Sequence, residues 1–305
     1  MKKLLNDIIY KVDKEALKGK TAAYIPELKE KNKKDFGLAI MDVEGREEGS
    51  GMYLKEFTIQ SISKSIVYLY ILESLGYEKI KELIDLEPSG EAFNSFKLKK
   101  MEDRFVAYNP MVNTGAIIAT SLVPGSSLDE KYNGIIDFTK KLLGKQNIKI
   151  DYKVYISEKK TGVNNYKIGK MLKEKNLIKD DIKDVLDLYF KQCSLLVSGR
   201  DLAFFGAVLA NNGVNPKTNV RLVREENIKY LKVAMLFSGL YDYSGNFLLK
   251  TGLIAKSGVG GGIVAFSPSK MGIGSFGPSL DIYGNSEKGI SALEKLSKSL
   301  NLSII

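Results

Sequence analysis

The sequence contains no histidine and a single cysteine, Cys193, among its 305 residues. Without histidine, the chain cannot use an imidazole in a catalytic triad, as a general base or as a metal ligand. With only one cysteine, we expect neither an internal disulfide nor a structural zinc site, and this cysteine usage is typical of a reducing cytosol. We therefore expect a cytoplasmic protein.

Long apolar segments are also missing. No run is long and apolar enough to span a bilayer. Residues 1–9 begin like a signal peptide, but Asn6, Asp7 and Asp13 interrupt the apolar region that an export signal requires. We expect an amphipathic helix at about residues 3–19 instead, and neither a membrane segment nor an export signal.

Arginine is scarce. Only five of the 46 basic residues are arginine, although the formal net charge is +10. Proteins that read bases and phosphates favour the forked guanidinium of arginine. The lysines alternate with acidic residues, as in residues 29–34, which is typical of a solvated surface. We therefore expect no nucleic-acid partner.

The pattern of apolar residues and glycines predicts the order of the secondary structure. Pro26 opens a short helix, an extended stretch is predicted at 36–43, and Gly49-Ser50-Gly51 leads through another extended stretch to Ser61. Helices are predicted at 61–75, 78–85, 112–124, 133–143, 165–175, 180–191 and 198–212. Strands are predicted at 253–256, 262–266 and 271–276, with a last helix at about 285–299.

Strands at both ends with helices between them predict an α+β fold, in which an antiparallel sheet is flanked by helices and carries an inserted, mostly helical lobe. We expect one domain over residues 1–305. Its sheet lobe comprises about 1–60 and 226–305, and its helical lobe comprises about 61–225.

Ser61 and Lys64 open a long apolar helix that ends at Gly76. Residues three apart share a helical face, so the two side chains can meet. There a neutral lysine can take the serine proton, and free backbone N–H groups can hold an oxyanion. The same spacing recurs at Ser157/Lys160 and Ser267/Lys270, and serine is also a common N-cap. The spacing alone therefore leaves a structural role open.

A second element lies far along the chain, at Lys256-Ser257-Gly258 in a predicted strand. Serine acyl-enzymes of the penicillin-recognising type combine a Ser-x-x-Lys helix with a Lys-Thr/Ser-Gly strand. The two elements occur here in that order, and together they indicate a fold and a nucleophile without a substrate. The glycines at 258–262 predict a turn where the backbone closely approaches a ligand or another strand. The glycines at 272–277 match a dinucleotide-binding pattern by letter, but the strand–turn–helix unit is missing, so we expect a glycine-rich strand.

The middle of the chain indicates the substrate. Five stretches, at 24–28, 59–64, 109–117, 209–216 and 255–259, closely resemble the serine-dependent glutaminases of the β-lactamase-like fold. The resemblance extends in order over nearly the whole chain. It implies that glutamine is hydrolysed to glutamate and ammonia, without a metal or an organic cofactor, by a homo-oligomer that is a dimer or a tetramer.

The resemblance also implies the roles of individual residues. Ser61 is expected to be the nucleophile, Lys64 its base, and the N–H groups of Ser61 and Val259 the oxyanion hole. The residues expected to bind glutamine are Asn113, Glu158, Asn165, Tyr189 and Tyr241, with Tyr24 close to the pocket. Tyr241 is also expected to relay a proton to the departing ammonia.

The chemistry of an amino-acid substrate agrees with this set. Its ammonium group requires a carboxylate such as Glu158, and its carboxylate requires donors such as Asn165 and Tyr189. Lys64 can act as a base only when neutral, and both burial and a second cation at Lys256 would lower its pKa.

Two other functions are compatible with parts of the sequence. One is a penicillin-interacting acyl-enzyme or β-lactamase. The absence of an export signal argues against it, because the substrates of such enzymes lie outside the cytosol. The other is a non-catalytic glutamine-binding protein, against which the intact pair Ser61 and Lys64 argues.

Overall fold

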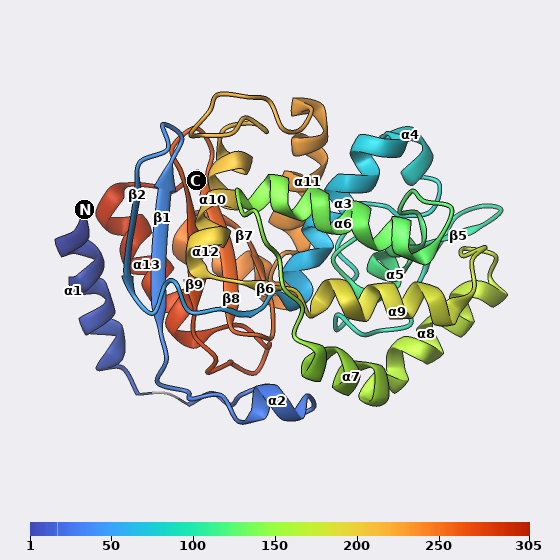
Figure 1. Cartoon of the computed structure of the whole chain (residues 1–305), viewed down its shortest axis with the longest axis horizontal. Coiled ribbons are helices and arrows are strands. Elements are labelled where there is room, and N and C mark those ends of the chain that lie inside the picture. Colours follow the sequence, from blue (N-terminus) through green and yellow to red (C-terminus); the bar gives the residue numbers. More distant parts are fainter. Residues whose placement is uncertain (17) are drawn as a thin grey trace.

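The centre of the fold is a five-stranded antiparallel sheet with the strand order β2-β1-β9-β8-β7 (Figure 1). The structure, a computed structural model, describes residues 1–16 and 18–305. The strands are β1 (Gly37–Asp42), β2 (Glu47–Gly51), β7 (Ile254–Ser257), β8 (Gly262–Ser267) and β9 (Met271–Phe276). In the pairing of β1 with β9, Gly37 lies opposite Phe276. The predicted antiparallel sheet and α+β class are thus confirmed.

Helices cover both faces of this sheet. Along β1, Leu38 and Ile40 pack into a cluster with α1 (Lys2–Asp13) and α13 (Glu287–Leu300), whereas Ala39 and Met41 belong to the core on the face of α10 (Gly199–Ala210). This alternation follows from the two-residue period of a strand. Glycine lets α10 approach β9 closely, because a Cβ atom at Gly274 would lie 1.9 Å from the carbonyl oxygen of Gly199. The predicted glycine-rich strand is confirmed.

A group of helices lies beside the sheet, to its right in Figure 1. They are α3 (Ser63–Leu75), α4 (Tyr77–Ile80), α5 (Asn113–Ser121), α6 (Leu128–Leu143), α7 (Tyr152–Thr161), α8 (Val163–Glu174) and α9 (Ile182–Cys193). At its centre, α3 is buried along most of its length and packs on α5, α6 and α11 (Glu225–Ser238). A helix that is apolar all round needs such neighbours on every side.

The remaining elements are short. They are α2 (Pro26–Lys29), α12 (Ser244–Thr251), the strands β3 (Phe57–Thr58), β4 (Lys99–Lys100), β5 (Phe105–Val106) and β6 (Leu196–Val197), and the 3₁₀ turns η1 (Gln60–Ile62) and η2 (Tyr241–Tyr243). No helix in the described ranges 1–16 and 18–305 has the length and apolar character needed to cross a membrane.

The helical elements differ from the sequence prediction in several ways. The helix predicted at 78–85 ends early, because α4 stops at Ile80 and Ile84 pairs with Ala107 instead. The first helix ends at Asp13, earlier than the predicted 3–19, and position 17 of that range lies outside the described residues. Three helices go beyond the prediction, namely α7, α11 and α12. At α7, Asp151 caps the helix by accepting hydrogen bonds from the N–H groups of Lys153 and Val154, and this cap supports a segment too polar to show a clear helical period.

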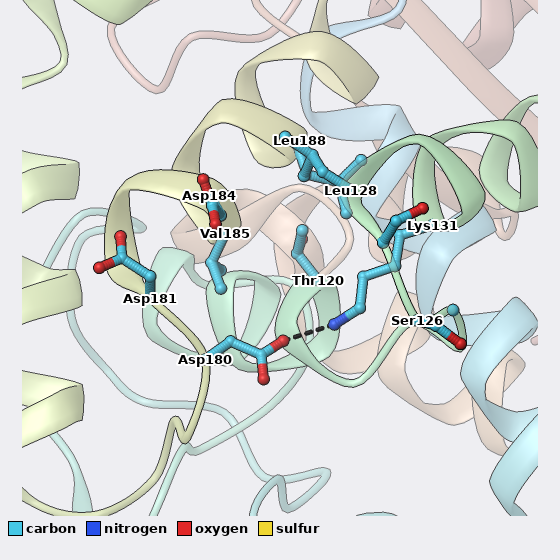
Figure 2. Close-up of a pocket in the computed structure, with 11 residues that line it drawn as sticks. Thr120, Ser126, Leu128, Lys131, Asp180, Asp181, Asp184, Val185 and Leu188 are labelled. Atoms are coloured by element: carbon cyan, nitrogen blue, oxygen red, sulfur yellow. Dashed lines mark hydrogen bonds and ion pairs between the residues drawn. The ribbon is translucent and has the colours of Figure 1, made fainter.

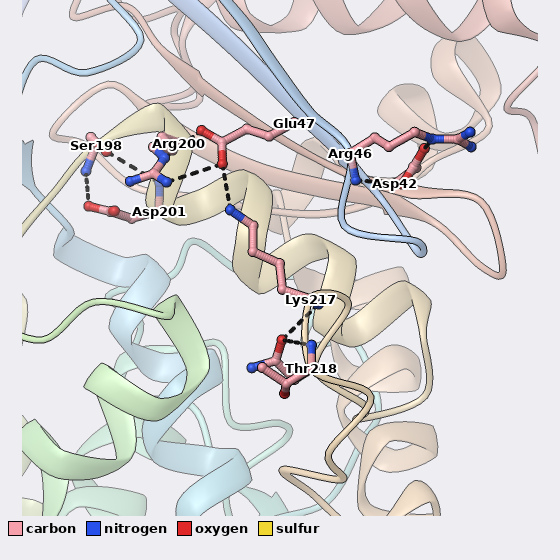
Figure 3. A network of polar contacts seen from close by, with 9 residues as sticks. Asp42, Arg46, Glu47, Ser198, Arg200, Asp201, Lys217 and Thr218 are labelled. Atoms are coloured by element: carbon pink, nitrogen blue, oxygen red, sulfur yellow. Dashed lines mark hydrogen bonds and ion pairs between the residues drawn. The ribbon is translucent and has the colours of Figure 1, made fainter.

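A polar network ties the edge of the sheet to α10 (Figure 3). Glu47 on β2 accepts hydrogen bonds from the guanidinium of Arg200 on α10 and, at 2.9 Å, from Lys217. At the N-terminus of α10, Ser198 and Asp201 form a capping box. The contacts of Glu47 join β2, α10 and the loop that carries Lys217, three segments that are distant in the sequence.

Candidate active site

Six of the residues singled out in the sequence line one cavity of about 470 Å³. They are Tyr24, Ser61, Asn113, Glu158, Asn165 and Tyr189. They come from separate parts of the chain: the segment before α2, the turn η1, and the helices α5, α7, α8 and α9. The remaining three residues, Lys64, Tyr241 and Val259, surround Ser61 outside this lining.

Ser61 lies in η1, at the entrance to α3. Within residues 57–69 it is the one residue that is not buried, so its side chain is presented to the cavity. The preceding residue, Gln60, has a φ of +51°, a left-handed conformation that is unfavourable for a side chain other than glycine. Such strain is often retained at functional sites, and here it sets the turn that exposes the serine.

The other two Ser-x-x-Lys serines hold structural hydrogen bonds. Ser157 Oγ donates to Glu27 Oε1 at 2.8 Å, and Ser267 Oγ donates to the carbonyl oxygen of Leu302 at 2.7 Å. Neither serine lines the cavity that contains Ser61. The structure thus distinguishes Ser61 from the two other serines that have the same spacing, which the sequence alone could not do.

Lys64 is buried one helical turn beyond Ser61. Its ammonium nitrogen donates to Asn113 Oδ1 at 2.7 Å and to the carbonyl oxygen of Met111 at 2.9 Å. Asn113 in turn donates through Nδ2 to Asn165 Oδ1 at 2.8 Å. Burial lowers the pKa of Lys64 to about 7, while the nearby Cys193 and Glu158 act in the opposite direction. A lysine in this state can serve as a base near neutral pH.

The ring of Tyr241 lies between two buried lysines. Lys256 Nζ is 4.1 Å from the ring centroid, and Lys64 Nζ is 5.5 Å from it. Burial and the charge of Lys64 lower the pKa of Lys256. The sequence predicted that Lys256 would lower the pKa of Lys64. The structure shows the effect of this repulsion on the pKa of Lys256, whereas the pKa of Lys64 is lowered by burial.

The Tyr241 hydroxyl is buried, and no residue in the described part of the chain forms a hydrogen bond with it in good geometry. Burial raises the pKa of Tyr241, and the neighbouring hydroxyl of Ser61 partly opposes that rise. Like Gln60, Tyr241 has a positive φ, +54°. Two strained residues thus flank the serine, and a neutral phenol lies within reach of it.

A glycine turn after β7 packs directly against the segment that carries Ser61. A Cβ atom at Gly258 would lie 2.7 Å from the carbonyl oxygen of Ile59, and one at Gly260 would lie 2.2 Å from that of Thr58. Val259 lies between these two glycines. Across residues 1–16 and 18–305, the N–H groups of Ser61 and Val259 have no backbone or side-chain acceptor. The predicted close approach of this turn to another segment is confirmed.

Glu158 is a buried carboxylate that lines the same cavity as Ser61. Gln60 Nε2 donates to Glu158 Oε1 at 2.8 Å and to Thr58 Oγ1 at 3.3 Å. Burial raises the pKa of Glu158 to about 7, and the hydrogen bond from Gln60 and the charge of Lys64 act against this rise. A buried carboxylate with one neutral donor favours the binding of a cation.

Several cavity residues were not singled out in the sequence. The main ones are Gln60, Phe93, Asn94 and Cys193. The position of Gln60 beside Ser61 was a usable signal. No pattern in the sequence indicated Phe93, because it lies in an irregular loop. Its ring centroid lies 5.0 Å from that of Tyr241, and its carbonyl oxygen accepts a hydrogen bond from the N–H of Asn113.

Another cavity, of about 300 Å³, lies between the start of α6 and the start of α9 (Figure 2). Lys131 forms an ion pair with Asp180 across it. Its lining contains no base next to a nucleophile. In the described parts of the chain, no group of three or more acidic or cysteine side chains is arranged to hold a metal ion. The cavity with Ser61 is therefore the better candidate for catalysis.

Comparison with known proteins gives a consistent result. The family model for glutaminase matches residues 19–305. Glutaminase 2 of Clostridium perfringens is 45% identical over 304 residues, with 100% of each chain covered. A glutaminase of Clostridioides difficile is 44% identical over 301 residues, which is 99% of this chain and 97% of that one.

Solved structures agree. The probable glutaminase ybaS superposes with a TM-score of 0.93 at 30% identity, covering 100% of this chain and 97% of that chain. The Bacillus subtilis glutaminase YbgJ, solved as a covalent complex with 5-oxo-L-norleucine, gives a TM-score of 0.91 at 32% identity over 100% and 99% of the two chains. By its sequence over nearly its whole length, and by its fold, this chain belongs to the glutaminase family.

Proposed function

We propose that this protein hydrolyses L-glutamine to L-glutamate and ammonia through an ester formed with Ser61. The single observation that carries the proposal is the cavity that a partly exposed Ser61, one helical turn from the buried Lys64, shares with the carboxylate Glu158. The curated relatives are named glutaminases, and the Bacillus subtilis enzyme forms a covalent complex with 5-oxo-L-norleucine. Both observations support this chemistry.

In the proposed mechanism, neutral Lys64 takes the proton of Ser61 while Oγ attacks the side-chain amide carbon. The N–H groups of Ser61 and Val259 would stabilise the oxyanion. The C–N bond then breaks as Tyr241, positioned between Lys64 and Lys256, relays the proton that Lys64 took from Ser61 to the departing ammonia, which leaves Lys64 neutral again. Water enters, Lys64 takes one of its protons, and the hydroxide adds to the ester carbon. The bond to Ser61 Oγ then breaks, Oγ takes the proton back from Lys64, and glutamate is released.

Substrate binding follows from the chemistry of the lining. Glu158 would bind the α-ammonium group, and Asn165 and Tyr189 would bind the α-carboxylate. Asn113 links the base to this end of the cavity, because it accepts from Lys64 and donates to Asn165. Tyr24, which is 57% exposed, would cover the mouth. This set requires neither a metal ion nor an organic cofactor.

Ammonia release from L-glutamine by the wild-type protein and by Ser61→Ala tests the proposal. Ser157→Ala is a matched control, because Ser157 has the same Ser-x-x-Lys spacing but donates to Glu27. We expect turnover to be lost in Ser61→Ala and retained in Ser157→Ala. L-Asparagine and a chromogenic β-lactam serve as parallel substrates, and we expect little turnover of either.

Absence of turnover by well-folded wild-type protein would refute the proposal. Glutamine binding without turnover would then favour a non-catalytic binding protein, and β-lactam hydrolysis a penicillin-interacting enzyme.

We further propose a cytoplasmic homo-oligomer, a dimer or a tetramer, in which residues 1–305 act as one catalytic domain. The lone, buried Cys193 supports a reducing compartment. The site supports a single domain, because Ser61 and Val259 come from its two lobes. Light scattering after size-exclusion chromatography and cell fractionation test these statements. A monomer, or a protein outside the cytoplasmic fraction, would contradict them.

A further inference from the structure

Two buried groups of opposite charge lie near Ser61, and neither forms an ion pair with another described residue. Glu158 lines the cavity, and Lys64 is linked to it through Asn113. Within the described ranges, Lys64 donates only to the neutral oxygens of Asn113 and Met111, and Glu158 accepts only from the neutral amide of Gln60. Ser61 follows Gln60, which donates to Glu158, and it lies one helical turn before Lys64. The segment 60–64 thus carries Ser61 together with Lys64 and with the residue that holds Glu158.

The two groups titrate as a coupled pair. Burial favours the neutral form of each, but the charge of Glu158 raises the pKa of Lys64, and the charge of Lys64 lowers that of Glu158. An ionised Glu158 without a cation therefore holds the proton on Lys64. That is the wrong state for a base, since only a neutral amine can accept the proton of Ser61.

The other titratable groups that face Lys64 do not carry a charge that could replace this effect. They come from β7, η2 and α9, and they are Lys256, Tyr241, Tyr189 and Cys193. Burial raises the pKa of Tyr241, Tyr189 and Cys193, which keeps these acids neutral, and burial with the charge of Lys64 lowers the pKa of Lys256. Among the described residues 1–16 and 18–305, Glu158 is consequently the one charge near Lys64 that a ligand entering the cavity can cancel.

We propose that the α-ammonium group of bound glutamine converts Lys64 to its basic form by neutralising Glu158. This inference rests on the proposed function and adds a role for a substrate group remote from the reacting amide. When the ammonium pairs with Glu158, Lys64 releases its proton to solvent. Lys64 then accepts the proton of Ser61 as Oγ attacks the amide carbon.

The consequence is selectivity expressed in rate. Glutaramate, which is glutamine without its amino group, presents the same amide to Ser61 but leaves Glu158 charged. It should therefore react slowly even at saturation, with Lys64 still protonated near neutral pH. A role of Glu158 in binding alone would raise KM for glutaramate and leave kcat unchanged.

The direct test follows the titration of Lys64 by NMR, with ¹³Cε-labelled lysine in the Ser61→Ala protein and Lys64→Met to assign the signal. We expect saturating glutamine to lower the midpoint of Lys64 by about 1 pH unit, the size typical of one nearby charge. We expect glutaramate to leave it unchanged. Wild-type protein with L-glutamate and with glutarate gives the same comparison without turnover.

An unchanged midpoint with both glutamine and L-glutamate would overturn the inference, as would an equal decrease with glutaramate. The variant Glu158→Gln provides a second test. Removal of the carboxylate should lower the midpoint in the ligand-free protein, and ligand should cause no further decrease. Glu174→Gln, at an exposed position on α8, is the matched control and should respond to ligand like the wild type.

Kinetics separate this inference from the function on which it rests. We expect kcat for glutamine to exceed kcat for glutaramate about 5-fold or more at pH 6, as a decrease of about 1 unit in the pKa of the base requires. Equal kcat values for the two amides would refute the inference alone. Failure to release ammonia from either amide would refute the proposed function as well.

Discussion

The ammonium nitrogen of Lys64 lies 2.7 Å from Oδ1 of Asn113, and it has no carboxylate partner within the described residues. A neutral amide orients the lysine without stabilising its charge as a carboxylate would. Lys64 is therefore held in place and can still lose its proton near neutral pH.

Replacement of Asn113 by aspartate tests the need for a neutral partner. Asn113→Asp keeps an oxygen near Lys64 but adds a negative charge, which raises the pKa of the lysine. The acidic limb of the pH–rate profile for kcat should move to higher pH by about 1 to 3 units, with activity recovered as the pH rises. An acidic limb at the wild-type position would show that Lys64 is not the titrating base.

The glycine turn at 258–260 offers a steric test of the oxyanion hole. In Gly260→Ala, the new Cβ atom would meet the carbonyl oxygen of Thr58 at 2.2 Å and push the Val259 N–H away from Ser61. We expect kcat to fall by about 10²–10³-fold, the effect of losing one oxyanion donor.

The matched control for that change is Gly245→Ala on α12, where an added Cβ has no neighbour within 4 Å. This control should keep full activity and unfold at an equal or slightly higher temperature, because alanine is the better helix former. Wild-type kcat in Gly260→Ala would exclude the turn from catalysis.

The acidic limb of kcat/KM should be steep. Below pH 7, Lys64 becomes protonated and can no longer act as a base, and Glu158 becomes protonated and can no longer bind an ammonium group. Both changes reduce activity in the same direction. A plot of log kcat/KM against pH should therefore approach a slope of about 2 on the acidic side. Glu158→Gln should reduce that slope to about 1, and a slope of 1 in the wild type would show that only one group matters.

The network around Glu47 should affect stability and leave catalysis intact. Burial opposes the ionisation of Glu47, but hydrogen bonds from Arg200 and Lys217 outweigh it and lower its pKa. Its contribution is thus present above the pKa of an unfolded glutamate and is lost as pH falls through the lower folded value. Because water screens this partly exposed network, we expect Glu47→Ala to reduce the free energy of unfolding by about 1 kcal/mol at pH 7.

Urea unfolding of the wild type and Glu47→Ala at pH 7 and pH 3 checks this prediction. The difference between the two proteins should shrink at the lower pH, and kcat at neutral pH should be the same in both. A difference that is independent of pH would mean that packing of Glu47, and not its charge, stabilises the sheet edge.

Much of the fold could be predicted from the sequence, because apolar periodicity reports burial. The strands around Ile263 and Ile273 and the helix after Ser61 follow directly from it. The helix α7 could not be predicted in this way, because its polar residues alternate without a clear period and its start depends on the cap at Asp151. The spacing of apolar residues predicts which elements are buried, but it does not predict a helix whose start depends on a capping side chain.

The candidate site was predictable where the chemistry is local. Ser61 and Lys64 are one turn apart, and the resemblance to glutaminases brought Asn113 and Glu158 into the same prediction. The contact between Gln60 and Glu158 was not predictable from spacing, because it joins residues 98 positions apart through a strained backbone. Periodicity carries no information about such a contact.

The pairing of β1 with β9 has a consequence for synthesis on the ribosome. The segment with Ser61 emerges well before Val259 and before β9, the strand that pairs with β1. Until then, a nascent chain would carry the proposed nucleophile without the second donor of the proposed oxyanion hole. The pairing of β1 with β9 also joins residues that are distant in the sequence, and such long-range pairing slows folding. Under the proposed mechanism, a nascent chain therefore gains activity only after β9 has paired with β1.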